Sequence, residues 1–440
     1  MRVLTSMLVP LAASALCLAG ATAAYAEEGG GTGDGAVIGD GAESLQVIVG
    51  PSGSSLDELA VPEATCTEGA GADVCKTVTR TLRRDLTLSF LYSVIPPRSY
   101  LAAKDEPVDK PAFPDWINIG AGFLAKAEIS GAGPYSATFR FYDVNQKATI
   151  SEASQNVTGL NKSQLTGAVH EFVNAIIGAR TGRPGVFGTR IAFAKKLAIG
   201  VKGIGIVDMD GANKKTLISN GSINMLPKWG FGGVLYTSFK DGQPEIFFGK
   251  QKLSRDAGHY RSVAVSPDGA RMVASISYGG QSDLYLLQKD GLVVGNLTST
   301  GSDEVSPTFS PDGTKVAFVS SAAGSPQIYM VGVGGGDPVR LTHKGAYNYA
   351  PDWGKNGLIV FAAMDEGKSD IFTVTEAGEV KRLTQNQGSN KDPSWSPDGR
   401  YVAFVSRRSG GSGVYIMSAD GRYQSLISQG GGVSNIAWER

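Results

Sequence analysis

The sequence predicts a small α/β N-terminal domain followed by an all-β six-bladed β-propeller, which is closed by the C-terminal strand. The main observation is a recurring tetrad, Ser-Pro-Asp-Gly, which begins at Ser266, Ser310 and Ser396. The second interval is about twice the first, and a degenerate copy, Gly354–Gly357, lies inside it. A repeat of roughly 40–45 residues with strand-like content is typical of propeller blades.

Each repeat contains four short apolar runs, which predict four antiparallel strands. In one copy, a run that ends at Phe309 is followed by the tetrad, whose proline and glycine favour a tight turn. The runs Lys315–Ser320, Gln327–Val331 and Pro338–Thr342 then complete the unit. Five complete units open near Asn224, Tyr260, Glu304, Asn348 and Asp392.

The sixth blade is divided between two distant parts of the chain. Residues 189–219 match the second, third and fourth strands of a unit, but no first strand precedes them. The C-terminal run Val433–Trp438 matches a first strand and is followed by no further strands. We expect this run to complete the blade, because closing the ring removes the open sheet edges that invite aggregation.

The N-terminal residues predict export and cleavage. Residues 1–26 carry one charge, at Arg2, an apolar core and small residues before Glu27, which together indicate a signal peptide. A membrane anchor is the alternative, but the core contains Pro10 and is short for the about 20 residues that a span needs. The glycine-rich residues 27–43 are expected to form a flexible leader.

Residues 44–183 are expected to form the α/β domain, and residues 184–440 to form the propeller. Apolar or alternating runs predict strands at Leu45–Val49 and Ala137–Val144. After Asp73, apolar residues recur at every fourth position, which predicts a helix with this aspartate at its N-cap.

A second amphipathic helix is predicted to begin after Asn161. Asn161 and Gln164 have the spacing of a capping box, in which each side chain bonds to the backbone of the other residue. An apolar stripe follows on one face of this helix. We expect Gly178, Gly182 and Pro184 to end it.

Two cysteines follow the predicted signal peptide, Cys66 and Cys75. In an oxidising compartment a local disulfide between them is favoured, and free thiols are the alternative. Two cysteines without a nearby histidine cannot form a structural zinc site.

The composition argues against nucleic-acid binding, and the motifs argue against catalysis. The 41 basic and 41 acidic residues leave no basic footprint. His170 starts a helical zinc motif, but Asn174 replaces the second histidine. No Gly-x-Ser-x-Gly nucleophile elbow occurs, and Asp208–Gly211 fits a hairpin turn better than a calcium loop. We therefore expect no enzyme activity, no metal site and no cofactor.

Several motifs outside the repeats resemble those of the TolB family of the Tol–Pal system. The segment Ala168–Ile177, with Thr181-Gly182 and Gly185-Val-Phe187 after it, is similar to the family's helix and following turn. Thr189-Arg-Ile-Ala-Phe193 resembles the family's Thr-Arg-Ile-Ala segment, and Phe141–Val144 resembles its Leu-Tyr-Asp strand. The resemblance extends over about residues 45–440.

The resemblance implies a monomeric, non-enzymatic adaptor in the periplasm that reaches the outer membrane through its partners. It would bind the peptidoglycan-associated lipoprotein (Pal) through one face of the propeller and TolA through its N-terminal region. This activity would support outer-membrane integrity and invagination during cell division. The glycine-rich leader departs from the family pattern at the extreme N-terminus, where the family contacts TolA.

The expected partner-binding face carries the loops that join each fourth strand to the next first strand. Aromatic residues among paired charges suit an interface with a few anchors and a polar rim. His259 lies seven residues before Ser266, where the family places a histidine of its lipoprotein-binding loop. The candidate residues are His259, Tyr260, Asp303, Glu304, Tyr347, Asn348, Tyr349, Lys391 and Asp392.

Two other classes of function stay open. A module that binds cell-wall carbohydrate or peptide would have affinity for isolated cell wall without any protein partner. A propeller hydrolase or lyase would need acids or metal ligands that converge in the central tunnel. Neither class explains the α/β domain or the Thr-Arg-Ile-Ala segment.

Overall fold

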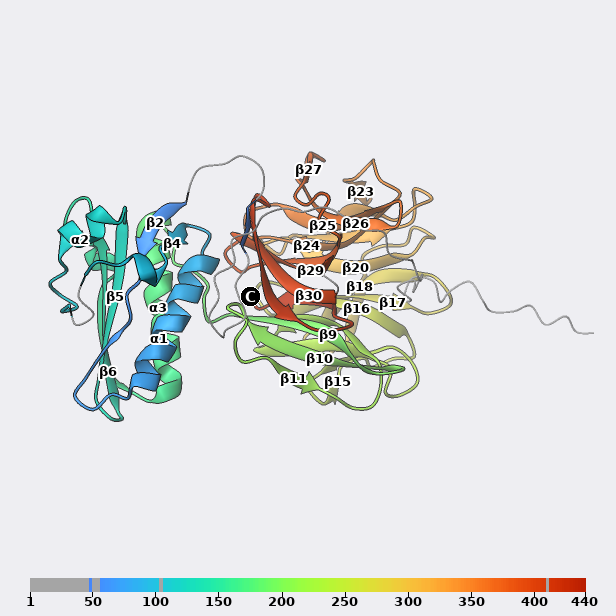
Figure 1. Ribbon diagram of the computed structural model, residues 1–440. Coiled ribbons are helices and arrows are strands. Elements are labelled where there is room, and N and C mark those ends of the chain that lie inside the picture. Colours follow the sequence, from blue (N-terminus) through green and yellow to red (C-terminus); the bar gives the residue numbers. More distant parts are fainter. Residues whose placement is uncertain (1–46, 50–55, 103–105, 409–410) are drawn as a thin grey trace, which may run out of the picture.

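The computed structural model describes residues 47–49, 56–102, 106–408 and 411–440. Figure 1 shows an N-terminal α/β domain beside a larger ring of sheets. The predicted signal peptide (1–26) and leader (27–43) lie outside the described residues. Within the described ranges, no helix has the length and apolar character that crossing a membrane requires.

The N-terminal domain is a mixed sheet with helices on both faces. Strands β4, β2, β5, β6 and β7 follow one another across the sheet, while β3 also pairs with β5 and β8 with β6. Figure 1 shows α1 and α3 on the face toward the propeller and α2 on the other side. The elements are β2 Asp57–Ala60, β3 Thr65–Thr67, α1 Ala72–Leu88, β4 Tyr92–Val94, α2 Phe113–Asn118, β5 Phe123–Ser130, β6 Tyr135–Asp143, β7 Ala148–Thr149, β8 Gln155–Leu160 and α3 Lys162–Thr181, with short 3-10 turns at Pro97–Ser99 and Ser151–Ala153.

The two long helices follow the predicted periodicity but differ at their ends. Helix α3 has the predicted capping box: Gln164 N donates to Asn161 Oδ1 at 3.0 Å, and Asn161 N donates to Gln164 Oε1 at 2.9 Å. It continues through Gly178 and ends at Gly182, whose φ of 77° suits a glycine C-cap. The N-cap of α1 is Gly71, so the prediction of Asp73 as the cap is wrong. Asp73 lies instead in the first turn, where a carboxylate is favoured by the helix dipole.

A disulfide joins β3 to α1. The sulphur atoms of Cys66 and Cys75 are bonded, with their Cα atoms 6.0 Å apart. Cys75 is buried in the apolar cluster beneath α1, which also contains Val74 and Val78. The bond therefore fixes the start of α1 to the sheet.

We expect replacement of both cysteines by serine to lower the free energy of unfolding by about 2–3 kcal/mol, because a closed loop of about ten residues constrains the unfolded chain. Urea unfolding of the oxidised protein and of the double variant tests this. Dithiothreitol should lower the midpoint of the wild type and leave that of the variant unchanged. Equal midpoints for the two oxidised proteins would contradict the expectation.

The propeller has the six blades that the sequence predicts. Five blades are antiparallel sheets of consecutive strands, of which the last has an additional fifth strand, and the remaining blade takes its first strand from the C-terminus. Blade 1 contains β32 Ser434–Trp438, β9 Arg190–Ala198, β10 Val201–Asp208 and β11 Lys215–Ile218. Blade 2 contains β12 Asn224–Gly230, β13 Gly233–Ser238, β14 Glu245–Phe248 and β15 Gln251–Lys252. Blade 3 contains β16 His259–Val265, β17 Arg271–Ser277, β18 Ser282–Gln288 and β19 Val293–Asn296. Blade 4 contains β20 Glu304–Phe309, β21 Lys315–Ser320, β22 Gln327–Gly332 and β23 Val339–Arg340. Blade 5 contains β24 Tyr347–Trp353, β25 Ile359–Asp365, β26 Lys368–Val374 and β27 Val380–Arg382. Blade 6 contains β28 Ser389–Trp395, β29 Tyr401–Arg408, β30 Gly411–Ser418 and β31 Tyr423–Gln429.

The repeated tetrad forms the turn between the first and second strands of a blade. In blade 4, Ser310 Oγ donates to Asp312 Oδ1 at 2.6 Å and accepts from Lys315 N at 2.9 Å. The same serine–aspartate bond recurs at Ser266 and Ser396. The serine thus ties the turn to the start of the next strand, which explains the recurrence of this residue type.

The last strand closes the ring by pairing with β9. Ala437 faces Ala192 and Trp438 faces Ile191 in this antiparallel ladder. Trp438 is 2% exposed, its indole donates to Thr189 Oγ1 at 2.9 Å, and its ring stacks with Tyr401 of blade 6. One side chain therefore joins blade 1 to blade 6.

Strand β1, Val47–Val49, does not belong to the N-terminal sheet. We expected a strand of the α/β domain at Leu45–Val49, but β1 pairs antiparallel with β31 and becomes a fifth strand of blade 6. The reason is that β31 is the outermost strand of its blade and offers an unpaired edge.

We expect Trp438→Ala to destabilise the propeller by about 3–5 kcal/mol, because it removes a fully buried indole at the ring closure. Urea unfolding followed by far-ultraviolet circular dichroism measures this loss. Val339→Ala, at a 52% exposed position of the outer strand β23 in blade 4, is the control and should change the midpoint little. Equal effects of the two substitutions would show that closure does not depend on Trp438.

Candidate partner-binding face

The N-terminal domain covers only one side of the propeller. Arg84 of α1 donates to the carbonyl of Asp210, in the turn after β10, and Arg400, in the turn before β29, donates to Thr181 and Arg183. Both turns join strands on the same side of the ring. Because strands alternate in direction, the loops from each fourth strand to the next first strand lie on the opposite side, which we call the loop face (Figure 1).

Three of the nine predicted residues are buried and cannot contact a partner directly. Tyr260 and Glu304 are 0% exposed and Asn348 is 1% exposed. Each stands at the start of a first strand, where the neighbouring blade and the preceding loop cover it. The prediction that they lie on the face is therefore wrong for their side chains, although their loops do reach it.

These buried side chains hold the loops in place. Asn348 Nδ2 donates to Gln327 Oε1 at 2.8 Å and to the Lys344 carbonyl at 2.9 Å. Tyr260 donates to Asp256 at 3.0 Å, and the amide of Gly258 donates to the same carboxylate oxygen at 3.0 Å. Burial alone would raise the pKa of Asp256, but the bonds from Tyr278, Gly258 and Tyr260 together lower it. The loops are therefore ordered before any partner arrives.

Glu304 is the one buried carboxyl group among the predicted residues. It accepts hydrogen bonds from Thr300 and from Ser320, the latter at 3.1 Å. Burial raises the pKa of Glu304 to about 7, since these two bonds only partly offset the burial and the nearby Asp283 raises it further. This group is therefore partly protonated at neutral pH.

The other predicted residues keep at least part of their side chains accessible. His259 is exposed, and Asp303 is partly exposed and lies 3.8 Å from Arg261. Tyr347 and Tyr349 pack edge to face, with ring centroids 5.4 Å apart, and Tyr349 donates to Ser369 at 2.9 Å. This pair is an aromatic anchor of the kind that interfaces use.

Lys391 and Asp392 belong to β28, and Asp392 lies closer to the propeller axis than we expected. Every first strand contains a register shift at this level, and Asp392 has a positive φ of 51°. The bulge directs Asp392 toward the axis, where its carboxylate accepts from Asn435 N at 2.7 Å. Asp392 therefore lines the tunnel and not an outer loop.

The tunnel is a narrow cavity of about 40 Å³. All six blades contribute to it through their bulges, and its charged lining residues are Lys228 and Asp392. Burial lowers the pKa of Lys228, an effect that Asp352 and Asp392 oppose. Sequence reasoning missed Lys228, although its position immediately after the repeated proline could have indicated it. The lining residues are Leu226, Pro227, Lys228, Ser262, Val263, Ser306, Pro307, Ala350, Pro351, Asp392, Pro393, Asn435 and Ile436.

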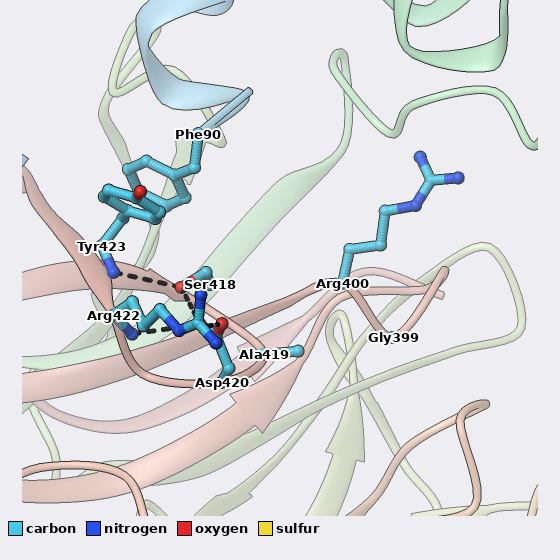
Figure 2. Close-up of a pocket in the computed structure, with 8 residues that line it drawn as sticks. All are labelled: Phe90, Gly399, Arg400, Ser418, Ala419, Asp420, Arg422 and Tyr423. Carbon is cyan, nitrogen blue, oxygen red and sulfur yellow. Dashed lines mark hydrogen bonds and ion pairs between the residues drawn. The ribbon is translucent and has the colours of Figure 1, made fainter. Parts of the chain in front are cut away.

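A second hollow lies on the side of the N-terminal domain. It has a volume of about 390 Å³ and lies between Phe90 and the turns of blade 6. Figure 2 shows Arg422 directed at Asp420, an ion pair of 3.0 Å, while Arg400 bonds to the segment after α3. The charged groups of this open hollow already have partners, so they do not converge on a ligand. No group of three metal-binding side chains occurs among the described residues.

The comparisons with known proteins identify the family. The sequence model of the TolB beta propeller domain matches residues 179–438, and that of the TolB amino-terminal domain matches residues 46–150. The chain belongs to the TolB family.

Two relatives illustrate how far the sequence similarity extends. The Tol-Pal system protein TolB of Anaeromyxobacter sp. (strain K) is 35% identical over 252 residues, which is 55% of this chain and 57% of that protein. The protein of the same name from Dinoroseobacter shibae is 30% identical over 272 residues, or 56% and 58% of the two chains. The chain thus aligns with little more than half the length of these TolB proteins.

A solved structure has the same fold over a larger share of the chain. TolB from Acinetobacter baumannii superposes with a TM-score of 0.74 and covers 90% of this chain and 99% of its own. At 24% sequence identity this similarity concerns the fold alone. The two-domain architecture is therefore that of TolB.

We expect the free energy of unfolding of Glu304→Gln, measured relative to that of the wild type, to increase as the pH rises from about 4.5 to about 7. A carboxyl group whose folded pKa is raised binds more protons in the folded than in the unfolded state within this window, so the wild type loses stability as the pH rises. Glutamine does not titrate, and the difference should grow by roughly 1–3 kcal/mol. Urea unfolding at both ends of the window measures it.

The control for this experiment is Glu379→Gln, at an exposed position after β26. It removes one carboxylate without entering the buried cluster around Glu304. A stability difference for Glu304→Gln that is the same at both pH values would contradict the raised pKa.

Proposed function

We propose that this TolB-family protein is a periplasmic, non-enzymatic adaptor of the Tol–Pal system that binds Pal through the loop face. The observation that carries the proposal is the arrangement of this face. Its accessible side chains include the exposed His259 and the partly buried Tyr347–Tyr349 pair, and it lies opposite the N-terminal domain. An open surface with aromatic anchors on prearranged loops suits a protein partner better than a small ligand.

The loop face also favours an adaptor over an enzyme. Of the predicted acids, Glu304 is buried in hydrogen bonds to its own blade, and Asp392 is bonded to the backbone of Asn435. The tunnel cavity that Asp392 lines is about 40 Å³, which is too small for a sugar or peptide substrate, and Glu304 does not line it. A hydrolase would need acids that converge in a space of substrate size.

We assign the TolA contact to the N-terminal region, as the family resemblance implies. Through both partners the protein would support outer-membrane integrity and invagination at division, as a monomer. A protein lacking residues 27–43 should then lose affinity for TolA while it still binds Pal. Equal binding of TolA by the full and the shortened protein would exclude the leader as the contact.

We expect saturable one-to-one binding when the protein from Glu27 onward is titrated calorimetrically with the soluble domain of Pal. His259→Ala and Tyr347→Ala should each weaken binding by more than ~1 kcal/mol, as interface anchors do. Lys355→Ala, on an exposed turn at the opposite side, is the control and should bind like the wild type.

Three outcomes separate the possibilities. Loss of affinity for Pal in His259→Ala and Tyr347→Ala, but not in Lys355→Ala, supports the loop face as the site. Unchanged affinity in both variants would keep Pal as a partner but exclude this site. Absence of binding at high micromolar concentrations would exclude the adaptor function and favour a cell-wall module, which isolated peptidoglycan would then test.

A further inference from the structure

The β9–β10 hairpin of blade 1 ends in an exposed apolar tip. Strand β9 passes into β10 through a two-residue turn, Ile199-Gly200, in which Gly200 has a φ of 72°. Ile199 is 93% exposed and Leu197 39%, while Leu217 on the adjacent β11 is 44% exposed. A tight turn holds Ile199 outward, so that it cannot fold back onto the blade.

Lysines surround this tip without acidic partners. Lys196 faces Lys202 directly across the β9–β10 ladder, although like charges in this position repel each other. Lys195 precedes this pair, and none of the three forms an ion pair with a residue in the described part of the chain. No aspartate or glutamate occurs in residues 192–206 or 213–219. We call Lys195, Lys196, Leu197, Ile199 and Lys202 the hairpin tip.

The hairpin tip points away from the N-terminal domain. The opposite end of the hairpin, at Asp208–Gly211, contacts α1 through the bond from Arg84 to the Asp210 carbonyl. Eight extended residues separate these ends by roughly 25 Å. Figure 1 shows β9 and β10 (green) running from the domain junction to the far side of the ring. The tip therefore lies at the rim of the loop face.

The combination of features fits a lipid surface better than a protein surface. A protein would need a pocket to receive a side chain as prominent as Ile199, whereas a bilayer accepts apolar side chains without a matching shape. Lysine side chains can place their ammonium groups at the level of phosphates while their methylene stems follow the apolar residues inward. Juxtaposed lysines also attract anionic headgroups, and each adds to the affinity. Lys196 and Lys202 face each other without an acidic partner, so an anionic surface that approaches them relieves their mutual repulsion.

We propose that the hairpin tip docks on a bilayer surface that contains anionic phospholipid, with Ile199 and Leu197 entering the headgroup region and the three lysines contacting phosphates. This contact is separate from the proposed Pal interface. It would orient the ring at the membrane even when no lipoprotein is bound. Because only two apolar side chains enter the bilayer, the binding is weak and reversible.

The test is sedimentation of the protein, from Glu27 onward, with large vesicles. We expect binding to vesicles of about 30% phosphatidylglycerol in phosphatidylethanolamine, and little binding to vesicles of phosphatidylcholine alone. Raising the salt from about 0.05 M to about 0.5 M should release most of the protein. Ile199→Ser should lower the partition coefficient at least about fivefold, as loss of one inserted side chain predicts. The triple variant Lys195→Gln, Lys196→Gln, Lys202→Gln should lower it at least about tenfold.

Matched controls remove the same chemistry elsewhere. Val380→Ser removes a 51% exposed apolar side chain from β27 of blade 5, and should bind vesicles like the wild type. Lys250→Gln, Lys355→Gln, Lys381→Gln removes three exposed lysines from other blades and keeps the net charge equal to that of the hairpin triple variant. Because all of these side chains are at the surface, circular dichroism and thermal unfolding should be unchanged.

A second readout reports insertion directly. The emission of Ile199→Trp should shift to shorter wavelength, and be quenched by brominated acyl chains, when anionic vesicles are added; Val380→Trp should show neither change. Equal binding to both kinds of vesicle would overturn the proposal, as would equal losses in the hairpin and control triple variants. Loss of binding in the lysine variant without any loss in Ile199→Ser would also overturn it, and would point to a soluble acidic partner.

Discussion

The pairing of β32 with β9 is the interaction on which the rest of the structure depends. It joins the end of the chain to the first propeller strand after the N-terminal domain, so that six separate sheets become one ring. The residues around β32 reinforce the closure on several sides. Trp229 of blade 2 donates to the Ala437 carbonyl at 3.0 Å, Arg190 and Glu439 form a two-point ion pair, and Arg440 reaches Asp352 of blade 5 at 2.8 Å. With the stack of Trp438 on Tyr401 of blade 6, the terminal residues contact blades 1, 2, 5 and 6.

The position of the N-terminal domain follows from this closure. Helices α1 and α3 rest on blades 1 and 6, the two blades that β32 holds together, and a single apolar cluster continues from the N-terminal sheet into both. A buried polar pair lies beside this junction: His170 Nδ1 is 2.7 Å from Asp85 Oδ2. Burial raises the pKa of Asp85 to about 7, against the opposing effect of His170. For His170, the bond and charge of Asp85 outweigh the effect of burial and raise its pKa. The histidine that the sequence places in a broken zinc motif therefore has a structural role.

The arrangement of the loop face follows from the bulge that each first strand contains near the propeller axis. Each first strand bulges once, which turns residues into the tunnel, and in blades 4, 5 and 6 a buried polar residue stands two positions before the first tunnel residue. Asn348 and Asn390 show this arrangement in adjacent blades, where each amide donates to a side chain of the preceding blade, Gln327 of β22 and Asp370 of β26. The side chains left for partners are those on either side of the buried position, such as His259 and the tyrosine pair of blade 5. The hairpin tip of blade 1 adds a second, chemically different surface on the same side of the ring.

The sequence by itself determined the blade count and the capping box of α3, because each depends on residues that are near one another in the chain. It also indicated the closing strand, because the first strand that is missing before residue 189 recurs in the repeat pattern as the run Val433–Trp438. Serine, proline, aspartate and glycine form the same turn wherever they recur, and Asn161 and Gln164 need only each other. The tertiary structure decided what depends on neighbours far along the chain. A short apolar run such as Val47–Val49 has strand character but carries no information about which open edge it joins, here that of β31. Tyr260, Glu304 and Asn348 read as loop residues, yet the packing of successive blades buries them, and the bulge of β28 moves Asp392 to the axis. Turn chemistry is local, whereas burial is set by whatever the rest of the ring places against a side chain.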